Sequence, residues 1–279
     1  MNRYGTMFRS LAARGEGAFG AFVILGDPDL QTSADIMDAL VEGGADMLEV
    51  GIPFSDPVAD GPVIQEAAVR ALAKGVTPAD CFALLTDFRA RHPDVPVGLL
   101  TYANLVVARG RAAFYGAAED AGVDSVLVAD VPMFEAAPYL TASREAHIAP
   151  VLIAAPNTPD STLRKIAAAG EGYTYCVARA GVTGADEEVR FGHSQMLGTL
   201  KAFGAPPPVF GFGISQPGHV VQALEAGAAG VISGSAIVRL IADNPGGEAD
   251  AVRAFVSEMK AATRSTSGGG RRSGDTRTG

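Results

Sequence analysis

The sequence has no tryptophan, only two cysteines in 279 residues, and no apolar run of the roughly 20 residues that span a bilayer. Residues Met1 to Arg14 also lack the apolar stretch of a secretory signal. Cys81 falls in a helical pattern and Cys176 in a strand pattern, so we interpret both as buried thiols in a reducing compartment. We therefore expect a cytoplasmic protein that does not contact a membrane.

Three common kinds of site are missing as well. The histidines have no ligand-like spacing to one another or to the cysteines, so we expect no metal site: they are His92, His147, His193 and His219. Neither a P-loop nor a GxGxxG motif occurs. The formal net charge of -9 argues against a nucleic-acid partner, because such surfaces carry basic patches.

Short apolar runs alternate with longer helical patterns through most of the chain. Several runs are continuously apolar, which is typical of parallel strands covered on both faces. We expect eight strands, at Ala18–Leu25, Met47–Gly51, Val97–Thr101, Ser125–Ala129, Ala149–Ile153, Tyr173–Val177, Val209–Phe212 and Gly230–Ser233. This alternation predicts an α/β fold, a single (β/α)₈ TIM barrel with extra helices such as Pro78–Arg91.

A weak internal repeat supports the barrel. Glu42–Asp46, Asp120–Asp124 and Glu225–Ala228 each end a helix in glycine and lead into a buried strand. We assign residues 1–263 to the barrel. Residues 264–279 contain no apolar side chain, so we expect a disordered tail there.

The segment Glu49–Pro62 carries three acids, Glu49, Asp56 and Asp60, on a proline-rich loop that follows the second strand. Barrel active sites lie at the C-terminal ends of the strands, so Glu49 and Asp60 are candidate catalytic acids. A carboxylate that interrupts an apolar strand is costly unless it is paired or used. The structural alternatives are an ion pair of Glu49 with an arginine and a helix cap by Asp60.

Glycine-rich segments follow the last three strands, at Gly181–Gly184, Gly211–Ser215 and Ser233–Ala236. Phosphate sites in barrels often use these loops and the start of a short helix, because backbone N–H groups approach a phosphate closely only where side chains are absent. We therefore predict a small phosphorylated ligand. The segment Arg179–Arg190 suits a lid, in which Arg179 binds the phosphate or pairs with an acid such as Asp56.

Apolar and aromatic residues near strand ends complete the candidate pocket. Each of them is equally consistent with ordinary core packing: Phe22, Leu100, Tyr102, Ile153 and Tyr175.

Several motifs together resemble those of the α subunits of tryptophan synthase, over a span from Tyr4 to about Ala262. The most specific is Glu49–Gly61, and the others are Leu25–Pro28, Tyr102–Leu105, Val128–Pro132, Gly181–Gly184, Gly211–Ser215 and Gly234–Val238. The resemblance implies a (β/α)₈ barrel that cleaves indole-3-glycerol phosphate to indole and glyceraldehyde 3-phosphate. It also implies a pyridoxal-phosphate-bearing β subunit in an αββα complex, and no cofactor in this chain.

The resemblance assigns roles to individual residues. It makes Glu49 and Asp60 the catalytic acids and Thr183 the lid residue that contacts Asp60. It places the phosphate near Gly184, Gly213, Gly234 and Ser235, and the indole ring near Phe22, Leu100, Tyr175 and Phe212. We expect the partner to contact the loop of Asp56 and Pro57 and the region Tyr102–Asn104.

Other functions remain open at this point. The chain is alternatively a catalytically weak subunit that mainly activates the β subunit, a stand-alone lyase that releases indole, or another phosphate-binding barrel such as an isomerase.

Overall fold

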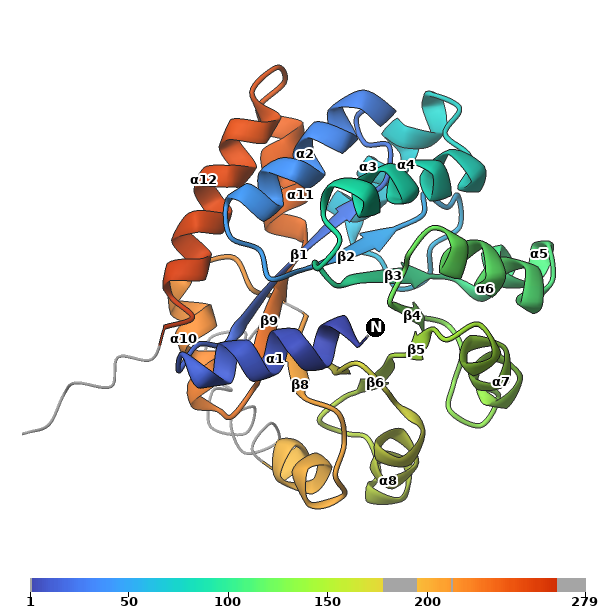
Figure 1. Cartoon of the computed structure of the whole chain (residues 1–279), viewed down its shortest axis with the longest axis vertical. Coiled ribbons are helices and arrows are strands. Elements are labelled where there is room, and N and C mark those ends of the chain that lie inside the picture. The colour runs from blue at the N-terminus through green and yellow to red at the C-terminus, as the bar shows by residue number, and fades with distance from the viewer. Residues whose placement is uncertain (1, 178–194, 212, 265–279) are drawn as a thin grey trace, which may run out of the picture.

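The computed structural model describes residues 2–177, 195–211 and 213–264. Parallel strands surround a central axis and helices cover their outer side, as a TIM barrel requires (Figure 1). The strands lie in the order β5-β4-β3-β2-β1-β9-β8-β7-β6. Their bounds are β1 Ala18–Ile24, β2 Met47–Gly51, β3 Val97–Thr101, β4 Ser125–Val128, β5 Ala149–Pro150, β6 Leu152–Ala154, β7 Thr174–Cys176, β8 Pro208–Phe210 and β9 Gly230–Ser233.

One expected strand, Ala149–Ile153, is divided into two. β5 pairs with β4 and β6 pairs with β7, and neither half pairs with both neighbours. Between them the Val151 N–H donates to the Val126 carbonyl at 3.1 Å. A single run of chain therefore serves both neighbours in succession, and the nine named strands occupy the eight positions that the sequence predicts.

The helices agree with the expected pattern except for two additions, α1 and α5. No helix within the described ranges is long and apolar enough to cross a membrane. A further helical segment covers 195–202. The bounds are α1 Arg3–Ala13, α2 Leu30–Glu42, α3 Pro62–Ala73, α4 Pro78–Arg91, α5 Ala103–Ala108, α6 Arg111–Asp120, α7 Ala137–Glu145, α8 Asp160–Ala169, α10 Pro217–Glu225, α11 Ser235–Asp243 and α12 Glu248–Ala261.

Helix α1 lies across one end of the barrel and was not expected from the sequence (Figure 1). The Asn2 side chain caps it by accepting a hydrogen bond from the Gly5 N–H at 2.8 Å. Its apolar residues Tyr4, Met7, Phe8 and Leu11 have the spacing of one helical face, and Tyr4 and Leu11 are buried. This spacing is present in the sequence and is the signal from which the helix could have been predicted.

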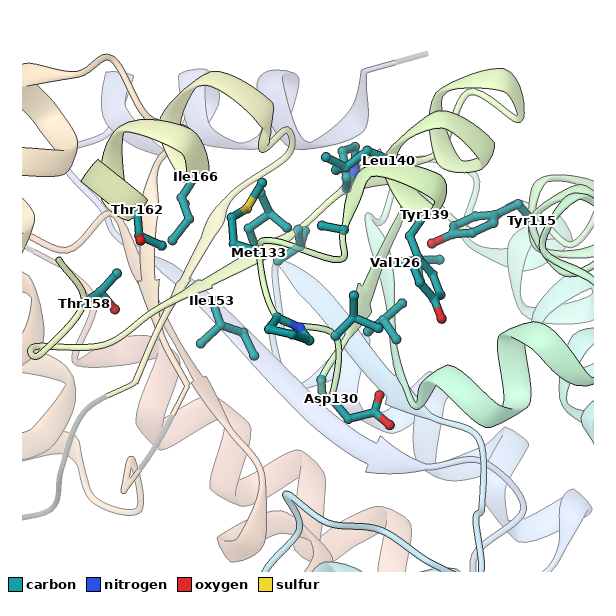
Figure 2. A pocket seen from close by; sticks show the side chains of 18 residues that line it. Tyr115, Val126, Asp130, Met133, Tyr139, Leu140, Ile153, Thr158, Thr162 and Ile166 are labelled. Carbon is teal, nitrogen blue, oxygen red and sulfur yellow. The ribbon is translucent and has the colours of Figure 1, made fainter. Parts of the chain in front are cut away.

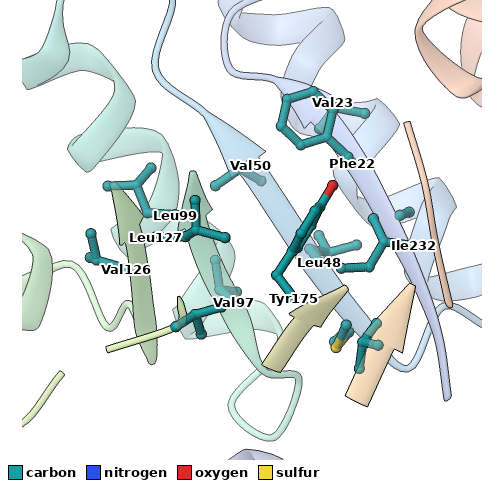
Figure 3. Close-up of a cluster of buried hydrophobic side chains, with 14 of the residues drawn as sticks. Phe22, Val23, Leu48, Val50, Val97, Leu99, Val126, Leu127, Tyr175 and Ile232 are labelled. Carbon is teal, nitrogen blue, oxygen red and sulfur yellow. The ribbon is translucent and has the colours of Figure 1, made fainter. Parts of the chain in front are cut away.

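The core consists of aliphatic and aromatic side chains on both sides of the strands (Figure 3). All residues of β1 and β2 are buried, as expected for parallel strands with helices outside and packed side chains inside. Both cysteines, Cys81 and Cys176, are buried free thiols, as the sequence suggested.

Aspartates at the ends of strands fasten neighbouring units of the barrel together. The Asp46 carboxylate accepts hydrogen bonds from the Phe19 N–H at 2.8 Å and from Lys260 of α12 at 2.9 Å. Asp124 accepts the Val97 N–H at 2.8 Å and pairs with both Arg3 and Arg89, each at 2.8 Å. These bonds tie together segments that are far apart in the sequence.

We predict that Asp124→Ala lowers the free energy of unfolding by about 3–5 kcal/mol, because it leaves a half-buried arginine and a backbone N–H without a partner. The matched control is Asp38→Ala, since Asp38 pairs with Arg91 and His92 on the surface and is 31% exposed. That change is expected to cost no more than about 1 kcal/mol. Urea unfolding monitored by circular dichroism measures both, and equal losses would contradict the prediction.

Candidate active site

A cavity of about 370 Å³ opens at the C-terminal ends of the strands. It brings together predicted residues from distant parts of the chain: Phe22, Glu49, Asp60, Leu100, Tyr175, Gly213, Gly234 and Ser235. Ile153, which the sequence left undecided, also lines it. Sequence reasoning missed Ile64, Leu127, Ala129, Val177 and Ile232. Other lining residues fall within the segments that the sequence singled out, namely Ala59, Gly61, Gly211, Ile214, Ser215 and Ala236.

Glu49 is the central residue of β2 and lies opposite Phe22 of β1 and Gly98 of β3. Only 2% of it is exposed. The Tyr173 hydroxyl donates a hydrogen bond to Oε1 at 2.6 Å, whereas Oε2 has no partner among the described residues. Burial raises the pKa of Glu49 to about 7, against the opposing effect of Tyr173. The alternative of an arginine partner is not seen within the described ranges.

Tyr173 is itself held by helix α1. Its ring packs against the Tyr4 ring with centroids 5.3 Å apart, and the Tyr4 hydroxyl lies 2.9 Å from Ser125 Oγ. Gly98 makes this possible, because a Cβ there would lie 2.9 Å from both the Tyr4 hydroxyl and Ser125 Oγ. The environment of Glu49 therefore includes a helix and two tyrosines that the sequence did not point to.

Asp60 lies in the loop after β2 and is half-buried. Burial raises its pKa, and the nearby Tyr102 hydroxyl opposes the rise. Among the described residues the Tyr102 hydroxyl forms no hydrogen bond of good geometry, so it does not fasten the Asp60 carboxylate. The structural alternative, in which Asp60 caps α3, is wrong. Gly61 is the N-cap residue, without a side-chain bond.

Two contacts fix the chain at Asp60 and in the helix that follows it. The Gln65 side chain donates to the Asp60 carbonyl at 2.7 Å. Further along α3, Arg70 forms a two-pronged ion pair with the buried Asp27, with both N–O distances at 2.8 Å. Because Asp27 follows β1, this pair joins α3 to the strand that carries Phe22.

Asp56 and Pro57 do not line the cavity. Asp56 is exposed and accepts a hydrogen bond from Ser55 Oγ at 2.6 Å. Four predicted site residues lie outside the described residues: Arg179, Thr183, Gly184 and Phe212. The suggested lid, Arg179–Arg190, lies there too.

Glycine-rich loops line the same cavity as the acids. Gly213 has a φ of 76°, a backbone conformation that favours glycine. Gly234 precedes α11 and supplies no side-chain cap, so the first N–H groups of this helix are not capped by a side chain. Ser233 Oγ donates to the Ile214 carbonyl at 2.6 Å and joins the two loops. Such a helix start favours an anion.

Comparison with known proteins decides the family. A family model described as tryptophan synthase alpha chain matches residues 8–265. The chain belongs to the tryptophan synthase alpha chain family.

Relatives support this membership over nearly the whole length. The chain is 55% identical to the tryptophan synthase alpha chain of Shewanella amazonensis over 94% of this chain and 100% of the relative. It is 54% identical to that of Escherichia coli over 95% and 100%. Among solved structures, the Legionella pneumophila alpha chain superposes with a TM-score of 0.87 at 31% identity, covering 96% and 99%.

The raised pKa of Glu49 predicts a pH-dependent difference between the wild-type chain and Glu49→Gln. In the folded chain Glu49 takes up its proton near pH 7, whereas in the unfolded chain it does so near 4.5. The wild-type chain therefore loses stability as the pH rises from 4.5 through 7, by about 3 kcal/mol from this residue.

Glu49→Gln cannot lose a proton, so its stability relative to wild type is expected to increase by about 3 kcal/mol between pH 4.5 and pH 8. Urea unfolding at several pH values measures the difference. Glu171→Gln is the control, because Glu171 is exposed. Parallel stability curves for Glu49→Gln and wild type would show that the Glu49 pKa is ordinary.

Proposed function

We propose that the chain cleaves indole-3-glycerol phosphate to indole and glyceraldehyde 3-phosphate by a retro-aldol reaction. The observation that carries the proposal is the pairing of a buried Glu49, whose pKa is near 7, with Asp60 in one cavity. Membership of the tryptophan synthase alpha chain family supports it.

The chemistry requires a proton donor and a negative charge at different places on the indole ring. Indole leaves poorly as a carbanion, so C3 takes up a proton before the bond to the glycerol chain breaks. Protonation places positive charge on the ring, which an ionised Asp60 near the ring N–H stabilises. Glu49 donates the proton to C3 and accepts the proton of the glycerol hydroxyl that becomes the aldehyde.

A pKa near 7 suits Glu49 to this double role, because both of its protonation states are accessible at neutral pH. In these steps the side chains of the protein only transfer protons and stabilise charge, while the carbon–carbon bond breaks within the substrate. We therefore propose that this chain needs no cofactor of its own.

The walls of the cavity match the remaining parts of the substrate. Phe22, Leu100, Leu127 and Tyr175 provide apolar surface for the indole ring. Gly213, Gly234 and the start of α11 at Ser235 form the phosphate end.

For the partner, we propose a pyridoxal-phosphate-bearing β subunit in an αββα complex that receives the indole, in the cytoplasm. One solved structure similar to this chain is a tryptophan synthase complex from Pyrococcus furiosus, with a TM-score of 0.79 at 36% identity over 88% of this chain and 99% of that chain. The docking face is expected to include Asp56 and Pro57 and the region Tyr102–Asn104. Val58 is 78% exposed beside Pro57 and adds apolar surface.

The decisive experiment follows indole and tryptophan formation from indole-3-glycerol phosphate, with and without a cognate β subunit. Glu49→Gln and Asp60→Asn are each expected to lower kcat at least about 100-fold. Asp56→Asn is the matched control on the same loop and is expected to keep the activity of the isolated chain. Absence of turnover with and without partner would overturn the proposal. Low turnover even in the complex would favour a subunit that mainly activates the β subunit. High turnover by the chain without its partner would favour a stand-alone lyase.

A second prediction concerns the phosphate end. Ser235→Asp adds a negative charge at the start of α11, where it suits the helix but repels a phosphate. The KM for indole-3-glycerol phosphate is expected to rise at least about tenfold, while the affinity for indole, which has no phosphate, stays the same. Ser235→Ala controls for the lost hydroxyl. An unchanged KM in Ser235→Asp would place the phosphate elsewhere.

A further inference from the structure

A second cavity, of about 390 Å³, lies beside the candidate active site (Figure 2). Strands β4, β5 and β6 form one side of it, and helices α6, α7 and α8 supply the other. Ala129 and Ile153 line both cavities, so they form a shared wall. The mechanism proposed above makes no use of this space.

The cavity is large enough to bind a small molecule. Pockets for small molecules begin at roughly 300 Å³, and this one is partly open to solvent. Figure 2 shows that it is elongated, with Tyr115 and Tyr139 at one end and Thr158, Thr162 and Ile166 at the other. A volume of this size holds a small molecule of one or two rings.

The lining favours an uncharged aromatic molecule. Aliphatic side chains such as Val126, Leu140 and Ile166 form most of the walls, and Met133 adds a thioether, which packs well against aromatic rings. Each end also offers a hydroxyl for hydrogen bonding, that of Tyr115 at one end and that of Thr162 at the other.

The charges argue against an anion. Asp130 is the sole carboxylate among the described lining residues, and its Oδ1 accepts the Ala103 N–H at 2.7 Å. No lysine or arginine lines the described part of the cavity. Arg111 does not line the cavity, and its guanidinium lies over the Tyr139 ring at 4.8 Å from the centroid. Among the described lining residues a phosphorylated or carboxylate ligand would therefore meet one negative charge and no cation.

We propose that this cavity is a second binding site for a small uncharged aromatic molecule, and that its ligand is indole. The choice of indole rests on the proposed function, because indole is then released on the other side of the wall formed by Ala129 and Ile153. The ring lies between the aliphatic walls and Met133, and the indole N–H donates to the Tyr115 hydroxyl oxygen. The site holds product beside the centre that forms it.

The test uses the full-length chain labelled with ¹³C at the methionine methyl groups and titrated with indole alone. Met133 lines the second cavity, and no other methionine of the described residues lines either one. We expect the Met133 resonance, assigned with Met133→Leu, to shift and saturate at millimolar indole or below. Benzoate, an aromatic anion, is expected not to shift it.

Two substitutions in neighbouring positions of α8 separate the second cavity from the active site. Thr162→Phe places a ring inside the cavity and is expected to weaken the Met133 response at least about tenfold. Ser161→Phe adds the same ring on the exposed side of the helix and is expected to leave the response unchanged. Circular dichroism checks that both fold. If Thr162→Phe does not fold, Ala136→Leu fills the cavity from the residue that precedes α7.

A Met133 resonance that stays in place up to the solubility limit of indole would overturn the proposal. So would an unchanged response in a folded, cavity-filling variant, since the shift would then come from indole in the active site. An equal response to benzoate would refute the ligand class. Binding is measured without turnover, so a chain that binds indole here but does not cleave indole-3-glycerol phosphate contradicts the proposed function alone.

Discussion

The burial of the Glu49 carboxyl group determines how the rest of the candidate site is arranged. Glu49 lies in the middle of a strand whose residues are all buried, and among the described residues only the Tyr173 hydroxyl donates a hydrogen bond to it. A carboxylate in such a place is unfavourable unless it is often protonated, and this is the reason for its raised pKa. The same burial that destabilises the charged form makes the residue able to donate a proton at neutral pH.

Asp60 complements Glu49 because its surroundings differ. It sits on a loop that is half-buried, so its charged form is penalised less. Two acids with different exposure in one cavity can divide the work, with one transferring protons and the other remaining charged. The ion pair of Asp27 and Arg70 and the Gln65 contact to the Asp60 backbone hold this second acid in place from outside the cavity.

Much of this arrangement is predictable from local patterns in the sequence. Continuous apolar runs with glycine turns locate the strands, and Glu49 stands out because a charged residue interrupts such a run. What escaped prediction depends on contacts between distant segments. In the sequence Tyr173 resembles any other strand residue, and only the structure shows that its hydroxyl donates to Glu49. The division of Ala149–Ile153 has a similar cause, because one half pairs with β4 and the other with β7. The second cavity likewise arises from the packing of three helices, which no local pattern specifies.

The contacts of Tyr4 with Ser125 and of Tyr173 with Glu49 have a consequence for how the chain folds. Tyr4 and Ser125 are 121 residues apart, and Glu49 and Tyr173 are 124 apart. Contacts of such long separation form slowly, because closing large loops costs entropy before any bond is gained. While the chain is being synthesised, β2 is complete long before Tyr173 exists. An intermediate with only the first half of the barrel would therefore contain Glu49 as an ordinary acid, and Glu49 acquires its raised pKa when the two halves of the barrel meet.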